Sequence, residues 1–147
     1  MAGAAILGPV NAASKTAARP RKAVSVLIAD DNEDTVKTLA AILIDEGHIA
    51  HTITNGALVM EGVNRFKPEV CILDIDMPGR SGYSLAREIV QVYGDRRPVL
   101  VAISGKFYTQ TDQLLARALG FDYFFKKPTE PDEIIAVLAD PQKRSSA

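Results

Sequence analysis

The chain has 147 residues, of which 47% are hydrophobic and 24% charged, a composition typical of one globular domain with a sizeable core. A formal net charge of −1 gives no reason to expect nucleic acid or a membrane surface as a partner, and a single cysteine, Cys71, excludes an internal disulfide and a zinc site built from cysteines. No apolar run approaches the roughly 20 residues of a membrane-spanning helix, so a cytoplasmic location is expected.

The first 22 residues are rich in Ala, Gly, Ser and Pro and show no sustained periodicity, which predicts a disordered N-terminal tail over residues 1–22. One folded domain is expected over residues 23–140. A polar C-terminal tail, residues 141–147, follows it.

Five apolar runs typical of strands alternate with five segments of helical spacing. Strands are predicted over residues 24–29, 48–54, 70–74, 99–103 and 122–125, and helices between Asn32 and Gly47 and over residues 57–66, 83–93, 109–119 and 131–139. In the first helix, for example, Val36, Leu39, Ala40 and Leu43 fall on one face. Consecutive strands joined by helices predict an open α/β sheet of parallel strands with helices on both faces.

Polar residues stand where four of these strands end. Asp30-Asp31 follows the first strand, Asp74 ends the third, Ser104 follows the fourth and Lys127 lies just past the fifth. Because the carboxyl ends of parallel strands share one edge of a sheet, these side chains are expected in one site. Crowded carboxylates repel one another unless a cation joins them, and hard oxygen ligands favour Mg²⁺. The pattern predicts a metal-assisted site that accepts a phosphoryl group.

These motifs resemble the receiver domain of two-component response regulators. The resemblance covers residues 24–140 and rests on Asp30-Asp31, on Leu73-Asp74-Ile75-Asp76-Met77-Pro78-Gly79 with Gly82, on Ser104-Gly105 and on Lys127-Pro128. It implies a flavodoxin-like (βα)5 doubly wound parallel five-stranded sheet with strand order 2-1-3-4-5.

The resemblance also implies a role for each site residue. Asp74 is the expected phosphoacceptor, and Lys127 and Ser104 contact the phosphoryl group. Mg²⁺ is expected to be held by Asp31, by Asp30 largely through water, by Asp74 and by the backbone carbonyl of Asp76. Ser104 and Phe124, the latter at a position where the family often has tyrosine, are the expected switch residues, and the Lys127-Pro128 peptide is expected to be cis.

Asp76 and Lys106 are a further pair of opposite charge. They stand two residues after the expected phosphoacceptor and two residues after the switch hydroxyl, respectively. In receivers these two positions flank the path of water to the phosphoryl group. We therefore expect the two side chains to approach each other and to influence autodephosphorylation.

The expected function is that of a single-domain response regulator. Its phosphodonor would be a sensor histidine kinase or a histidine phosphotransfer protein, and its output surface would lie on residues 109–119, 122–125 and 131–139, read by an unidentified downstream protein. It is not expected to be an enzyme beyond phosphotransfer to its own Asp74 and autodephosphorylation. A monomer is expected, with at most weak dimerisation on phosphorylation, and neither nucleic acid nor a membrane is an expected partner.

Two alternatives stay open at this stage. The first is a binding scaffold that resembles a receiver but works without phosphorylation. The second is a phosphatase of the haloacid-dehalogenase type, because Asp74-Ile75-Asp76 resembles the Asp-x-Asp of that class; Pro78 and the position of the motif after the third strand argue against it. His48 and His51 are too few for a metal site and are expected at the surface or at helix ends.

Overall fold

The computed structural model describes residues 22–106 and 109–142. The expected tail at residues 1–22 lies outside the described residues except for Lys22, and residues 143–147 lie outside them as well. The boundaries expected for the two tails therefore stay predictions.

Five parallel strands form a single sheet in the order β2-β1-β3-β4-β5, which confirms the predicted fold class. The strands are β1 Ser25–Ala29, β2 Ile49–Ile53, β3 Val70–Asp74, β4 Val99–Ser104 and β5 Tyr123–Lys126. Strands β3 and β4 are buried along their whole length because helices cover both faces of the sheet.

The helices fall where the apolar periodicity predicts them, with no end displaced by more than two residues. They are α2 Glu33–Asp45, α3 Val59–Phe66, α4 Gly82–Tyr93, α5 Gln110–Ala118 and α6 Pro131–Ala139, with short 3₁₀ turns η1 Gly56–Leu58 and η2 Gly94–Arg96. The helix expected from Ala57 begins with the 3₁₀ turn because Asn55 Oδ1 accepts a hydrogen bond from the Ala57 N–H, 2.8 Å away.

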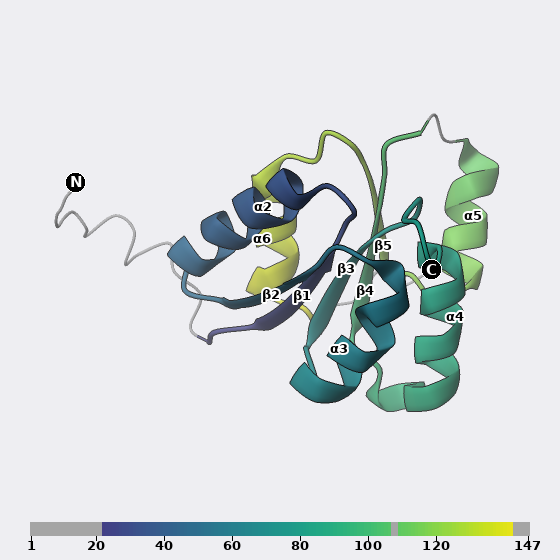
Figure 1. The fold of residues 1–147 in the computed structure, drawn as a ribbon, viewed down its shortest axis with the longest axis horizontal. Helices are drawn as coiled ribbons and strands as arrows, with labels where there is room; N and C mark the ends of the chain where they lie inside the picture. Colours follow the sequence, from purple (N-terminus) through teal and green to yellow (C-terminus); the bar gives the residue numbers. More distant parts are fainter. Residues whose placement is uncertain (1–21, 107–108, 143–147) are drawn as a thin grey trace, which may run out of the picture.

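The sheet divides the hydrophobic core into two parts, and Figure 1 shows helices on both sides of it. Helices α2 and α6 pack on one face through residues such as Leu43 and Leu138, and α3, α4 and α5 pack on the other through residues such as Leu85. Since each helix runs back from the carboxyl ends of the strands, the loops that enter the helices meet at that edge.

Of the two locations expected for the histidines, the surface or a helix end, His48 takes the second: it follows the C-terminal end of α2, and its N–H donates to the Leu43 carbonyl at 3.0 Å. It lies just before β2, is only 5% exposed, and its Nδ1 accepts a hydrogen bond from the Val24 N–H at 3.1 Å. Burial lowers the pKa of His48, against a smaller opposing effect of the nearby carboxylates of Glu46 and Glu69. The imidazole therefore accepts the N–H of the residue before β1, at the edge of the sheet opposite the acidic residues.

In the described part of the chain, no helix has the length and the apolar character that crossing a bilayer requires.

Candidate functional site

Asp30 and Asp31 occupy the turn between β1 and α2. Asp30 is buried, and its Oδ1 accepts a hydrogen bond from the Asn32 N–H at 2.9 Å. Asn32 in turn caps α2 by accepting from the Thr35 N–H at 3.0 Å. The cap fixes the start of the helix, so the turn holds Asp30 inward while the neighbouring Asp31 is exposed to solvent.

Asp74 is the last residue of β3 and is buried. Its Oδ1 accepts a hydrogen bond from the Asp76 N–H at 3.1 Å, and the next residue, Ile75, donates its N–H to the Ile103 carbonyl at 2.9 Å. Helix α4 starts directly against this strand end: a Cβ on Gly82 would lie 2.8 Å from the Ile75 Cα. The backbone that carries this carboxylate is thus closely packed. Because Oδ1 is held by the Asp76 N–H, Oδ2 is the oxygen directed toward the other site residues.

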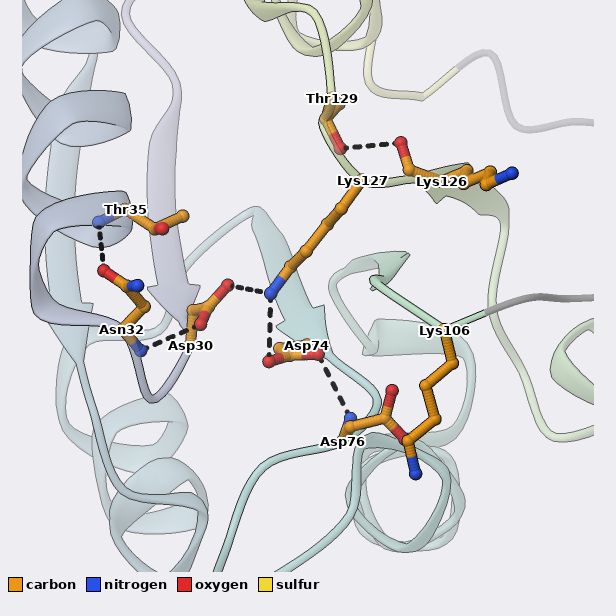
Figure 2. A network of polar contacts seen from close by, with 9 residues as sticks. All are labelled: Asp30, Asn32, Thr35, Asp74, Asp76, Lys106, Lys126, Lys127 and Thr129. Carbon is orange, nitrogen blue, oxygen red and sulfur yellow. Dashed lines mark hydrogen bonds and ion pairs between the residues drawn. The ribbon is translucent and has the colours of Figure 1, made fainter.

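Lys127, just past β5, joins the two buried acids. Its Nζ lies 2.7 Å from Asp30 Oδ2 and 3.2 Å from Asp74 Oδ2. Figure 2 shows the ammonium between the two carboxylates. Its backbone N–H donates to the Ser104 carbonyl at 2.8 Å, and a Cβ on Gly105 would stand 3.3 Å from the Lys127 Cδ, so a glycine there leaves room for the lysine stem. The Lys127-Pro128 peptide is cis, as expected.

The charges in this cluster shift one another's titration. Burial raises the pKa of Asp74, and the charge of Asp30 adds to the rise, while the Asp76 N–H and Lys127 act in the opposite direction. Burial alone would lower the pKa of Lys127, but the contacts with Asp30 and Asp74 outweigh it and raise the pKa. The ammonium is therefore held charged between two carboxylates.

The same acids fit a divalent cation. One carboxylate oxygen from each of Asp30, Asp31 and Asp74 lies within 4.8 Å of the other two. Three hard oxygen donors on one side, with solvent reached through Asp31, match the preference of Mg²⁺ for a few carboxylates together with water or phosphate oxygens.

The remaining predicted residues lie at the same edge or directly below it. Ser104 ends β4 and is buried, and it pairs in register with Lys126 of β5. Phe124 pairs with Ala102 and is partly buried against the core beneath α3, α4 and α5. Asp76 and Lys106 do approach each other, with Lys106 Nζ 3.6 Å from Asp76 Oδ1 (Figure 2).

Comparison with known proteins identifies the family of this arrangement. The family model described as "response regulator receiver domain" matches residues 26–139, most of the chain. The chain belongs to this family.

Relatives and solved structures agree with this assignment. The receiver is 29% identical over 112 residues to the transcriptional regulatory protein CreB of Escherichia coli K12, covering 76% of this chain and 48% of that protein. It is 29% identical to the aerobic respiration control protein ArcA of the same strain, covering 74% and 44%. A CheY-like receiver from Methanospirillum hungatei shares the fold, with a TM-score of 0.74 and 17% identity over 83% of this chain and 98% of that one.

A second solved structure is a response regulator from Burkholderia pseudomallei with a phosphorylated aspartic acid, a calcium ion and citrate. It has a TM-score of 0.70 and 24% identity, over 82% of this chain and 71% of that one.

The chain spans about half the length of the curated relatives it matches. Among them is a DNA-binding response regulator, MtrA of Mycobacterium leprae, at 27% identity over 76% of this chain and 48% of that protein. The expectation that nucleic acid is not a partner therefore has no support from the relatives. The single-domain organisation and the monomeric state likewise stay predictions.

A groove of about 570 Å³ between α2 and α6 adjoins the receiver's acid cluster. Leu39, Ile42 and Ile134 give it an apolar floor, and Lys127 lines one end. The acids Asp30 and Asp74 do not line it, so the groove is a neighbouring surface that meets the site only through the lysine.

Sequence reasoning missed the residues that hold the loop after Asp74. The Arg80 guanidinium donates to Ser84 Oγ at 2.6 Å and pairs with Glu88 on α4. The i to i+4 and i to i+8 spacing to Ser84 and Glu88 is the one sequence signal that points to these contacts, because it places both partners on the face of α4 nearest the loop.

Proposed function

We propose that this receiver is a phosphorylatable signalling module whose phosphoacceptor is Asp74. The observation that carries the proposal is the position of the Asp74 carboxylate. It is buried at the end of β3, its Oδ1 is held by the Asp76 N–H, and its Oδ2 lies beside the Lys127 ammonium and the second buried acid, Asp30. A carboxylate fixed in this way is oriented for attack on phosphorus.

The reaction transfers a phosphoryl group from a phosphohistidine of a sensor histidine kinase or a histidine phosphotransfer protein. A carboxylate oxygen of Asp74 forms the new P–O bond while the P–N bond of the donor breaks, and the donor's ring nitrogen keeps the electron pair. Asp30, Asp31, Asp74 and the carbonyl of Asp76 would hold Mg²⁺, which supplies positive charge to the phosphoryl oxygens when bound.

Two side chains, those of Lys127 and Ser104, would contact the phosphoryl group directly. Lys127 already stands beside Asp74 and is kept charged, so it neutralises charge that develops on the phosphoryl oxygens. Ser104, one strand away and buried at the same edge, supplies the hydroxyl that meets the new group. The added charge of about −1.5 to −2 attracts both residues.

Phe124 is the proposed second switch residue. It lies on β5 directly below the site, and a phenyl ring has no hydroxyl to anchor it in either position. Movement of Ser104 toward the phosphoryl group frees space that this ring can enter, which alters the surface formed by α5, β5 and α6. A downstream protein that reads this surface completes the proposal.

The test is intact-protein mass spectrometry after incubation with Mg²⁺ and a small phosphodonor, repeated with a phosphohistidine protein. The native chain should gain one phosphate and Asp74→Asn none. An adduct on both chains would mean that another carboxylate is the acceptor. No adduct with either donor would favour a scaffold that works without phosphorylation, and continuous release of phosphate would favour a phosphatase.

A further inference from the structure

The loop after Asp74, residues 75–81, touches a turn from a strand that is not its neighbour. The Gly56 N–H in the turn after β2 donates to the Pro78 carbonyl at 3.3 Å. Because β1 lies between β2 and β3 in the sheet, this contact passes across the end of β1, the strand that delivers Asp30 and Asp31. Turn and loop together form a bridge beside the acid cluster.

The bridge is packed backbone against backbone. A Cβ on Gly56 would lie 2.4 Å from the Arg80 carbonyl oxygen and 2.8 Å from the Arg80 nitrogen. On the loop side, Gly79 has φ +88°, and a Cβ there would lie 2.7 Å from Asn55 Oδ1. That oxygen is itself fixed, since it accepts from the Ala57 N–H. A side chain at Gly56 therefore displaces the loop, because no flexible group is available to yield.

The opposite side of the loop is anchored as well. Arg80 reaches Ser84 and Glu88 on α4, and the Gly82 N–H donates to the Ile75 carbonyl at 3.0 Å. Asp76 lies between these two points of attachment, and its N–H donates to Asp74 Oδ1. The position of its backbone thus depends on the turn after β2 on one side and on α4 on the other.

We propose that Asn55 and Gly56 are positioning residues that set the backbone of Asp76 for metal binding and for phosphoryl transfer to Asp74. The assignment of those roles to Asp76 and Asp74 rests on the proposed function. The physical basis is preorganisation: a ligand that is already in place costs no reordering when the cation binds, and supporting groups around a metal site commonly change its affinity by about 10- to 100-fold.

The experiment compares Gly56→Ala with Gly62→Ala. The control makes the same chemical change six residues further along, but its new Cβ meets the end of a side chain, Ile53 Cδ1, instead of a backbone. Mg²⁺ is titrated into each folded variant while the amide signals of residues 74–82 are followed by NMR. Gly56→Ala should shift those signals before any metal is added. It should also raise the dissociation constant for Mg²⁺ by about tenfold. Gly62→Ala should do neither.

Asn55→Ala is the milder second variant, because it adds no atom, and it decides the question if Gly56→Ala does not fold. It should weaken Mg²⁺ binding, and Asn55→Ser, which keeps an oxygen acceptor for the Ala57 N–H, should recover most of the affinity.

Native Mg²⁺ affinity in both Gly56→Ala and Asn55→Ala would overturn the proposal, as would an equal loss in Gly62→Ala. A native chain that binds Mg²⁺ but never accepts phosphate would instead refute the proposed function, and the affinity comparison would still decide the role of the turn.

Discussion

We predict that the pairing of Lys106 with Asp76 affects the chemistry of the site more than the stability of the fold. Their ion pair joins loops that follow different strands, and the side chain of Lys106 is 77% exposed, so the pair contributes little to folding. If Asp74 is phosphorylated, Lys106→Ala removes a side chain from the path of water and should shorten the phosphoryl lifetime several-fold, about fivefold for each 1 kcal/mol. Decay of the phosphorylated mass measures this.

The matched control is Lys37→Ala, which removes the lysine of another exposed pair, that with Glu33 on α2. A lifetime that is unchanged in Lys106→Ala, or shortened equally in both variants, would argue against a role for the pair.

His48 makes stability depend on pH. Its pKa is lowered in the folded chain, so the folded state resists a proton that the unfolded state accepts. The resulting stability is present above the ordinary pKa of about 6.5 and is lost as pH falls below it, by at most about 1.4 kcal/mol per pH unit for one proton. Urea unfolding between pH 5 and 8 measures the slope.

The comparison variant is His48→Asn, whose Oδ1 can accept from the Val24 N–H but does not titrate. The difference between the two slopes isolates the contribution of His48, because every other group is shared. Equal slopes would show that the imidazole is protonated as readily folded as unfolded.

Residues of the site were more predictable than residues that support the fold. Asp30, Asp74, Ser104 and Lys127 were placed together because each follows an apolar run and parallel strands share an edge. The burial of His48 was not predictable, since it depends on a partner 24 residues away that carries no side-chain signal, a backbone N–H.

At the scale of elements, β4 and β5 are tied together by one buried carboxylate. Asp122, 7% exposed, accepts from the Leu100 N–H at 2.9 Å and makes two hydrogen bonds with the Arg97 guanidinium, at 2.9 and 3.1 Å. Asp122→Ala removes the acceptor of a buried N–H and breaks a largely buried ion pair. We expect the free energy of unfolding to fall by about 3 kcal/mol.

Chemical denaturation with urea gives this value. The control is Asp95→Ala, the same change at an exposed position in η2, which should stay within about 0.5 kcal/mol of the native chain. A loss below about 1 kcal/mol in Asp122→Ala would show that the free energy gained from the contacts of Asp122 with β4 and Arg97 barely exceeds the cost of removing these groups from water.

Periodicity predicted the elements well because each helix and strand buries one face or both, and the spacing of apolar residues indicates which faces are buried. It could not predict how loops meet. The contact of Gly56 with Arg80 and the pairing of Arg97 with Asp122 both depend on residues distant in sequence whose approach is set by the finished fold.

For the whole molecule, Mg²⁺ should be a stabilising ligand. The carboxylates of Asp30, Asp31 and Asp74 are gathered only in the folded chain, so a cation that binds them favours folding. At a concentration one hundred times the dissociation constant the gain is about 2.7 kcal/mol, and chelation should reverse it. Thermal unfolding with Mg²⁺ and then with excess chelator measures the effect.

Asp31→Asn is the informative variant, because Asp31 is exposed and its removal leaves the buried pair of acids with Lys127 intact. It should lose most of the Mg²⁺ response while folding normally. If the melting temperature of the native chain were the same with and without Mg²⁺, the three acids would not bind the ion.

The central sheet has a consequence for how the molecule tolerates change. Neighbours along β1, such as Leu27 and Ile28, belong to different halves of the core, and among residues 22–106 and 109–142 the two halves have no buried side chain in common. Substitutions under α2 and α6 should therefore add to substitutions under α3, α4 and α5 without interaction terms. We therefore expect libraries that vary one face at a time to leave the packing of the other face largely unchanged, which would make the chain a suitable scaffold for them.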